Sequence, residues 1–377
     1  MKKVICIPDS FKGTMSSAEV CAVMKQVLHE HLPEAEILEI PVADGGEGTV
    51  DAFLATAAGE KIWLPVRGPY FEEMQAFYGM IGDTAIIEMA ACAGLPLVED
   101  RKNPLLTTTY GAGQLMLDAA RRGCRKMIVG LGGSATNDAG CGAAAALGVQ
   151  FLNASLESFI PTGGTLENVR SIDVSNIDPI LADIEIVTMC DIDNPMFGLQ
   201  GAAYIFGPQK GADAVMVQTL DQGLRHLSNV IQTSLGIDVS QVAGGGAAGG
   251  MGAGMIAFLG SELKMGIEVV LDTVQFETLL EHTDLVFTGE GRIDTQSLRG
   301  KVPIGVARRA KQKQIPVIAV AGAAAYQIER VYEEGVSAYF TINQAPLPFE
   351  EAKQYSLQNL AITMENIIRL LQTNKTI

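Results

Sequence analysis

The sequence has few of the residues on which several classes of protein depend. Only four of its 377 residues are histidine, and only one is tryptophan. No histidine lies in a glycine-rich or acidic cluster, which argues against His-based catalytic triads and His-rich metal sites. Aromatic residues make up 6% of the chain, too few to favour stacking platforms for single-stranded nucleic acid. Catalysis is therefore expected to use Asp, Lys, Ser, Thr, Asn and backbone amides.

Positive charge and long apolar runs are also scarce. The chain carries 27 Lys and Arg against 43 Asp and Glu, a formal net charge of −16. This balance disfavours binding to nucleic acid and to anionic membrane surfaces. No run of about twenty apolar residues could span a membrane, and no signal-peptide core follows Lys2 and Lys3. We expect a cytoplasmic protein without nucleic-acid or membrane partners.

The six cysteines lie far apart and form no C-x-x-C pair. This spacing is typical neither of a disulfide framework nor of a structural zinc site. The sequence therefore predicts reduced thiols.

Strand and helix patterns alternate at both ends of the chain, and the chain is long enough for two domains. Strands are expected at 4–8, 35–41, 284–287, 317–320 and 338–341. Helices are expected at 18–31 and 349–371, and helices are expected to begin near Thr49, Val302 and Ala325. The middle adds antiparallel strands at 62–64, 75–80 and 84–88, a helix at 110–122, and strands at 127–130 and 185–189. The sequence predicts an α/β fold with two α/β domains. One parallel-sheet domain is built from residues 1–70 and 280–377, and one mixed α/β domain, 71–279, is inserted.

Polar motifs follow several of the expected strands, where functional groups of parallel sheets gather. The first, after strand 4–8, contains Asp9, Ser10 and Lys12. These residues suit a small anion with its metal ion, or alternatively a capped turn with a solvated lysine.

The second motif, 43–49, interleaves three glycines with two acids. Its glycines allow backbone amides to approach a ligand, while its acids could hold Mg²⁺ or accept a hydroxyl proton. The candidate residues are Asp44, Gly45, Gly46, Glu47, Gly48 and Thr49.

The third motif, 130–140, is neither a Walker A nor a Rossmann sequence, but it leads glycine-rich backbone into a helix. It predicts anion binding by Gly132, Gly133, Ser134, Thr136, Asn137 and Asp138.

Further candidates lie in the middle of the chain. Asp191 and Asp193, with Asn194, could coordinate Mg²⁺ or orient a hydroxyl, or form an Asx turn before Pro195. Lys210 lies on a turn that suits a phosphate contact or an exposed loop. The glycine run 244–254 favours close packing or a hinge over a phosphate cradle.

The last motif, 288–301, is expected to be a strand-to-helix connection. It offers Gly289, Glu290, Gly291, Arg292, Asp294 and Lys301. Phosphoryl transfer needs cations and amides on the phosphates, and acids for Mg²⁺ and for the attacking hydroxyl. Lys12, Arg292 and Lys301 would reverse the negative potential locally.

Taken in order, these motifs, with Phe206–Gly211, closely resemble those of the bacterial type I glycerate kinases over nearly the whole chain. The resemblance implies ATP-dependent phosphorylation of D-glycerate, usually to 2-phosphoglycerate, with Mg²⁺. It also implies two α/β domains, one flavodoxin-like and discontinuous, with the active site in the cleft between them. Met196 and Phe197 are conservative departures.

The mechanism we expect is direct in-line transfer from ATP to a glycerate hydroxyl. Lys12 or Arg292 would hold the glycerate carboxylate, and Asp44, Asp191 and Asp294 would supply the Mg²⁺ ligands and the proton acceptor, with Glu47 and Asp193 as further metal candidates. A 3-phosphoglycerate product, a dinucleotide-dependent hydroxyacid dehydrogenase and a noncatalytic anion sensor are the alternatives. A homodimer is left open.

Overall fold

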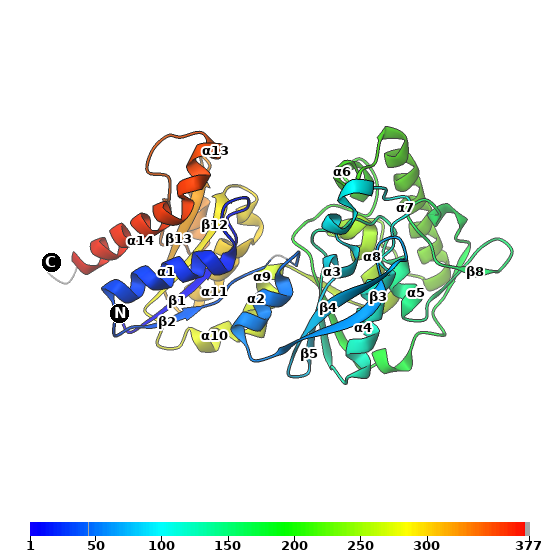
Figure 1. Ribbon diagram of the computed structural model, residues 1–377, viewed down its shortest axis with the longest axis horizontal. Coiled ribbons are helices and arrows are strands. Elements are labelled where there is room, and N and C mark those ends of the chain that lie inside the picture. Colours follow the sequence, from blue (N-terminus) through cyan, green and yellow to red (C-terminus); the bar gives the residue numbers. More distant parts are fainter. Residues whose placement is uncertain (44, 374–377) are drawn as a thin grey trace. The chain divides into compact units, whose positions relative to one another are not determined.

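A computed structural model describes residues 1–43 and 45–373, which form two compact units. Unit 1 comprises 1–43, 55–57 and the segment from Met265 onward, and unit 2 comprises 44–54 and 58–264. The N-terminal segment, dark blue in Figure 1, and the C-terminal segment, orange to red, both belong to unit 1.

The sequence-based boundaries at 70/71 and 279/280 differ from this division, for two structural reasons. Strand β3 (Glu60–Arg67) pairs along its whole length with β4 (Glu73–Ile81), so it belongs to the sheet of unit 2. Helix α9 (Gly266–Thr273) contacts α11 (Val302–Gln312) of unit 1. Arg309 of α11 forms ion pairs with Glu268, Asp272 and Glu277, the last on α10 (Phe276–Leu279).

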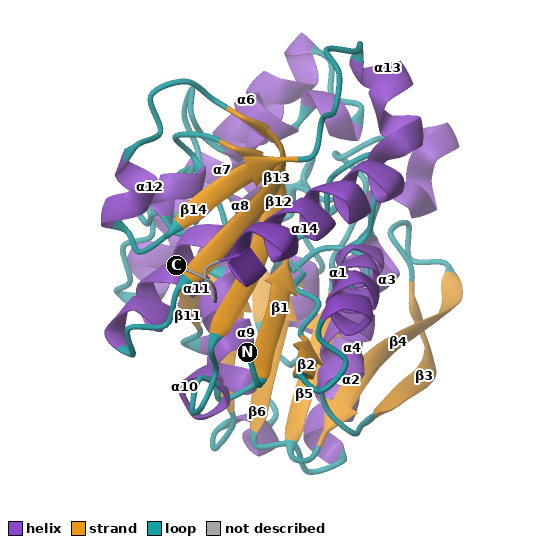
Figure 2. Ribbon diagram, turned by 90° about the vertical axis from the view of Figure 1, so that its left-hand side faces the viewer, coloured by secondary structure: helices purple, strands orange, loops and turns teal. Residues whose placement is uncertain are grey.

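The sheet of unit 1 is parallel throughout and has the order β14-β13-β12-β1-β2. Its strands are β1 (Lys3–Pro8), β2 (Glu36–Glu39), β12 (Leu285–Ile293), β13 (Val317–Ala324) and β14 (Ala338–Thr341). Within the unit this is the flavodoxin order 2-1-3-4-5, which confirms the predicted sheet built from both chain ends (Figure 2). The order reverses between β1 and β12. Ligands of such sheets bind at this switch point, outside the carboxyl ends of the strands.

Helices cover this sheet for reasons that the local sequence supplies. Helix α1 (Ser17–His31) begins at a capping box between Ser16 and Glu19, and buries Val20 and Met24. It packs against α14 (Ser356–Thr373), while α11 contacts β12 and β13.

Two predicted helices of unit 1 are shorter than expected. The helix predicted from Ala325 is only α12 (Arg330–Glu333), because Gln327 has a φ of 61°, which no right-handed helix contains. The helix predicted at 349–371 is divided into α13 (Phe349–Ala352) and α14 by a 3₁₀ turn at Lys353–Tyr355.

Unit 2 contains a six-stranded sheet of order β11-β10-β6-β5-β4-β3 and a three-stranded sheet of order β8-β7-β9. The remaining strands are β5 (Thr84–Glu88), β6 (Lys126–Gly130), β7 (Gln150–Leu152), β8 (Ser158–Phe159), β9 (Ser171–Asp173), β10 (Glu185–Met189) and β11 (Glu262–Lys264). β3, β4 and β5 pair antiparallel as predicted, and β5, β6, β10 and β11 pair parallel. The mixed sheet confirms the second α/β domain.

The helices that belong largely to unit 2 are α2 (Thr49–Thr56), α3 (Ala90–Ala93), α4 (Tyr110–Arg121), α5 (Cys141–Ala146), α6 (Ala202–Phe206), α7 (Ala214–Leu235) and α8 (Ala247–Leu259). Three left-handed residues, 248–250, interrupt α8. A Cβ on Gly249 would lie 2.1 Å from the Thr136 carbonyl oxygen, so bare backbone is required there. The glycine run 244–254 thus serves close packing.

All six cysteines are free and buried. Across the described residues, no helix has the length and apolar character needed to cross a membrane.

Candidate functional site

The switch point of unit 1 brings together residues from two of the predicted motifs. Pro8 pairs with Gly289, so Asp9 follows β1 directly beside β12. The Asp9 amide donates to the Gly289 carbonyl at 2.8 Å, and the Ser10 amide donates to the Asp9 carboxylate at 2.6 Å. A Cβ on Gly289 would lie 2.2 Å from the Val320 carbonyl oxygen, so this glycine is needed for strand packing.

Glu290 is the most deeply placed acid of this group. It lies within β12, which continues to Ile293, so the motif predicted as a connection is mainly strand. The Glu290 side chain is 6% exposed, and its Oε1 has no hydrogen-bond partner among the described residues. Burial raises its pKa to about 7. A hydrogen bond with Ser297 and the charge of Lys301 oppose that rise, while the charges of Asp9 and Asp294 add to it.

Asp294 and Lys301 lie close enough to this acid for their charges to affect its pKa. The Asp294 carboxylate accepts from the Gln296 amide at 2.8 Å and starts the turn that leads to α11, where Lys301 is the N-cap residue. Arg292 is exposed, with its Nε 3.9 Å from Asp294 Oδ2. Lys12 is exposed on the loop after β1. Unit 1 therefore collects acids and cations at the strand ends, as the sequence predicted.

In unit 2, the two predicted glycine loops lie against each other. The Gly132 amide donates to the Gly45 carbonyl at 2.9 Å. A Cβ on Gly130 would lie 2.3 Å from Gly45 O, and one on Gly132 would lie 2.5 Å from Gly46 Cα. These glycines are therefore required where two backbones touch. Glu47 is exposed, and Asp44 lies outside the described residues.

Lys210 is buried beside the glycine-rich loop at 130–140, and it does not lie on an exposed turn. It is 2% exposed, and its Nζ donates to Ser134 Oγ at 2.8 Å and to Thr136 O at 2.7 Å. Burial lowers its pKa to about 7, although the charge of Asp138 opposes the shift. Next to it, Thr136 Oγ1 and both amide atoms of Asn137 are buried, and within 1–43 and 45–373 they have no hydrogen-bond partner. Unsatisfied buried atoms are rare, and a bound ligand is one explanation for them.

Asp138 is directed into the protein. Its carboxylate accepts from Thr109 N and Oγ1, both at 2.8 Å, and from the amides of Gly140 and Gly142 at 3.2 Å. Burial raises its pKa, and these hydrogen bonds oppose the rise. Asp138 thus fixes the loop, and its predicted contact with a ligand stays a prediction.

Sequence reasoning missed Glu88, the last residue of β5. It is 2% exposed and accepts from the amides of Gly48 and Val50, both at 3.2 Å. Burial raises its pKa, and the two hydrogen bonds oppose the rise. It therefore anchors the glycine-rich turn and the start of α2. An acid that ends an apolar strand was the signal available in the sequence.

Asp191 and Asp193 follow β10, whose Met189 pairs with Gly130 of β6. Asp191 thus leaves the same sheet edge as the loop of Gly132 and Ser134. Asp191 is half-buried and Asp193 is exposed. Among the described residues, no three His, Cys, Asp or Glu side chains form a group that could hold a metal ion by themselves. The metal roles of Glu47, Asp191, Asp193 and Asp294 stay predictions.

Known proteins resemble this chain along its whole length. A family model described as the Glycerate kinase family matches residues 4–372. Glycerate kinase of Bacillus cereus is 47% identical over 368 residues, 97% of each chain. Glycerate 2-kinase of Escherichia coli is 44% identical over 372 residues, 98% of each chain. A crystal structure described as glycerate kinase 2 of Salmonella typhimurium LT2 matches with a TM-score of 0.87 and 41% identity, covering 100% of both chains. The chain therefore belongs to the glycerate kinase family of phosphotransferases.

Proposed function

We propose that the protein transfers the γ-phosphoryl group of ATP directly to a hydroxyl of D-glycerate, forming 2-phosphoglycerate. The observation that carries this proposal is the group at the switch point of unit 1. There, the buried carboxylate of Glu290, one oxygen of which has no partner in the part of the chain that the structure describes, lies near Asp9, Asp294 and Lys301. Phosphoryl transfer depends on positioning and on charge stabilisation, and this group offers both. The relative from Escherichia coli supports the 2-position, because it is named glycerate 2-kinase.

The acids of this group suit Mg²⁺. In phosphoryl-transfer sites Mg²⁺ is bound by one or two carboxylates, by waters and by the substrate phosphates, so a cage of three protein ligands is not required. Glu290 and Asp294 would hold it, and it would neutralise charge on the β- and γ-phosphates. Lys301, and the exposed Lys12 and Arg292, would attract the polyphosphate in a chain whose net charge is −16.

The buried group of unit 2 suits a small hydroxyacid. Lys210 offers one cation for a carboxylate, and Thr136 and Asn137 offer donors and acceptors for hydroxyls. A bound carboxylate would favour the charged form of Lys210. Asp191 leaves the same sheet edge as this loop, so we assign it as the acceptor of the hydroxyl proton.

The test is ATP turnover with D-glycerate and Mg²⁺, with the product detected through enolase alone and then through enolase with phosphoglycerate mutase. Signal with enolase alone is the expected result. Signal only after addition of mutase would move the phosphate to the 3-position. If neither assay detects product although the protein is folded, the proposal is overturned.

Two variants test the assigned roles. Asp191→Asn is expected to lower kcat by about 10²–10⁴-fold, the usual contribution of a general base. Lys210→Met is expected to raise the KM for glycerate more than that for ATP. The matched control is Lys102→Met, which removes an exposed lysine of the same unit and is expected to leave both constants unchanged.

A further inference from the structure

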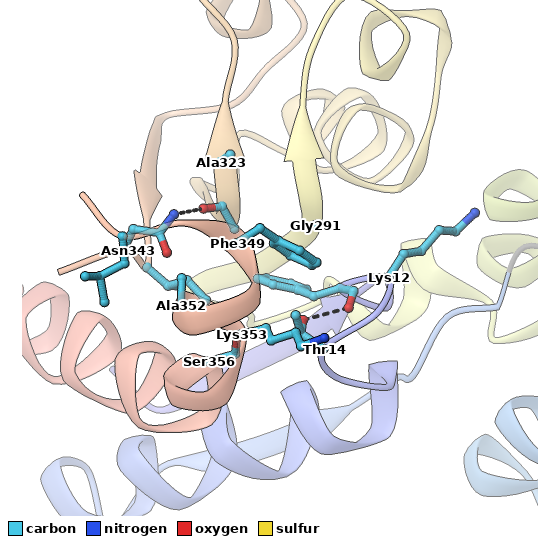
Figure 3. Close-up of a pocket in the computed structure, with 13 residues that line it drawn as sticks. Lys12, Thr14, Gly291, Ala323, Asn343, Phe349, Ala352, Lys353 and Ser356 are labelled. Carbon is cyan, nitrogen blue, oxygen red and sulfur yellow. Dashed lines mark hydrogen bonds between the residues drawn. The ribbon is translucent and has the colours of Figure 1, made fainter. Parts of the chain in front are cut away.

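A cavity of about 260 Å³ opens in unit 1 at the carboxyl edge of its sheet. One side of it is lined by backbone at the end of β12, by Gly322 of β13 and by Asn343, which follows β14. The loop after β1 forms one wall, and the segment from Leu347 to Ser356 forms the other (Figure 3). The motif that follows β1 contributes Phe11, Lys12 and Thr14 to its lining, and the motif at 288–301 contributes Gly291.

The walls are mainly apolar and aromatic. Phe11 is buried at the base of the loop after β1, while Phe349 is 59% exposed and Leu347 is 40% exposed. Single exposed apolar residues are ordinary, but these two line one cavity with a buried ring. An aromatic ligand would cover them and remove their apolar area from water.

The lining includes an exposed polar side chain, Asn343, that a hydrogen bond holds in place. Asn343 Nδ2 donates to the Gly322 carbonyl at 2.7 Å, which fixes the orientation of the amide. Figure 3 shows the amide oxygen turned to the α13 side of the cavity. Carboxamides of this kind pair with the edge of adenine, where the exocyclic amine is a donor and a ring nitrogen is an acceptor.

The size and position of the cavity select its occupant. Pockets for drug-sized ligands are usually about 300–1,000 Å³, so this one suits a single planar ring system and not a complete nucleotide. Gly291, at its border, directly follows Glu290 of the switch-point group. The Lys12 side chain, also at the border, points away from the other labelled residues (Figure 3). A nucleotide whose base lies in the cavity can therefore extend its phosphates past Lys12 to the switch point.

We propose that this cavity binds the adenine ring of the ATP co-substrate. The proposal rests on the proposed kinase function, because it is that reaction which requires a nucleotide. It assigns Phe349 to the ring face and Asn343 to the ring edge.

Binding of adenosine, measured by saturation-transfer NMR, tests the cavity without any need for turnover. Wild-type protein is expected to contact the adenine protons, and Ala352→Phe, which fills the cavity from α13, is expected to abolish the contact. Phe349→Ala is expected to weaken it. The matched control is Tyr326→Ala, which removes an aromatic side chain that is 97% exposed and does not line the cavity. Equal unfolding midpoints establish that the variants are folded.

Kinetics separate this proposal from the function on which it rests. Ala352→Phe is expected to raise the KM for ATP by about 10-fold or more, while the KM for glycerate stays within about twofold. Wild-type turnover with an unchanged KM for ATP in Ala352→Phe would overturn the cavity and leave the kinase function intact. Adenosine contact that is absent from wild type, or retained in Ala352→Phe, would also overturn it. Absence of glycerate turnover in wild type would instead overturn the function, and the adenosine result would still decide the cavity.

Discussion

Burial of Lys210 should give the stability of unit 2 a pH dependence that one substitution removes. Burial lowers the pKa of this lysine from 10.5 to about 7. Between these values the unfolded chain binds a proton that the folded chain does not bind. Because protons then favour the unfolded state, the free energy of unfolding must rise with pH through this window. Residue 210 of the Lys210→Met variant has no titrating group, so the contribution of Lys210 to this rise disappears.

The size of the effect follows from the two pKa values. A difference of about 3.5 units corresponds to about 5 kcal/mol over the whole window. Of this, about 2 kcal/mol accrues between about pH 6 and about pH 8.5. Measurement should stop there, because burial also raises the pKa of thiols such as Cys92, to about 12. Such thiols stay protonated in the fold while the unfolded chain loses its protons near pH 9, which lowers stability.

The assay is urea unfolding followed by the fluorescence of Trp63, the only tryptophan, which lies on β3 of unit 2. Between about pH 6 and about pH 8.5, the free energy of unfolding of wild type and of Lys102→Met should rise by about 2 kcal/mol more than that of Lys210→Met. Parallel curves for wild type and Lys210→Met would refute the reasoning. They would show that the Lys210 ammonium retains its proton in the fold through interactions that outweigh its burial.

Three further changes have defined outcomes. Gly132→Ala places a Cβ 2.5 Å from Gly46 Cα and should cost about 1–3 kcal/mol of unfolding free energy. Gly48→Ala has open space around the new Cβ but a φ of 88°, and should cost roughly 1 kcal/mol. Equal urea midpoints for the two variants would contradict this. Glu88→Ala leaves two amides without their acceptor and should cost about 1–3 kcal/mol, with Glu88→Gln less damaging; thermal unfolding distinguishes them. Arg309→Met removes three ion pairs and should cost about 1–3 kcal/mol, less at high salt, so a loss independent of salt would argue against an electrostatic origin.

Elements with strong local signals were predicted well. The strand at 185–189 and the strand at 338–341 have the predicted bounds, and α1 begins within one residue of its predicted start because its capping box is visible in the sequence. The predicted helix from Ala325 failed because one residue, Gln327, adopts a left-handed conformation that its residue type does not reveal. The boundary at 70/71 failed because pairing of β3 with β4 is a long-range choice.

Candidate site residues were found more easily than their roles. Gly132 and Lys210 were recognised by position and type, but neither the contact of Gly132 with Gly46 nor the burial of Lys210 follows from local sequence. Asp138 and Glu88 show the same limit, since a carboxylate that binds a ligand and one that binds backbone amides look alike in a sequence. Three-dimensional contacts decide between them.

The position of β1 in its sheet has a consequence for synthesis on the ribosome. β1 lies between β2 and β12, and β12 begins only at Leu285. At roughly 5–20 residues per second, the apolar strand Lys3–Pro8 waits roughly 15–55 s for its second neighbour. Unit 2 is complete before then, so the inserted segment can fold first while the N-terminal strands stay exposed to chaperones and to pairing with other nascent chains. A circular permutation that begins at Met265 would make unit 1 nearly continuous and shorten that delay.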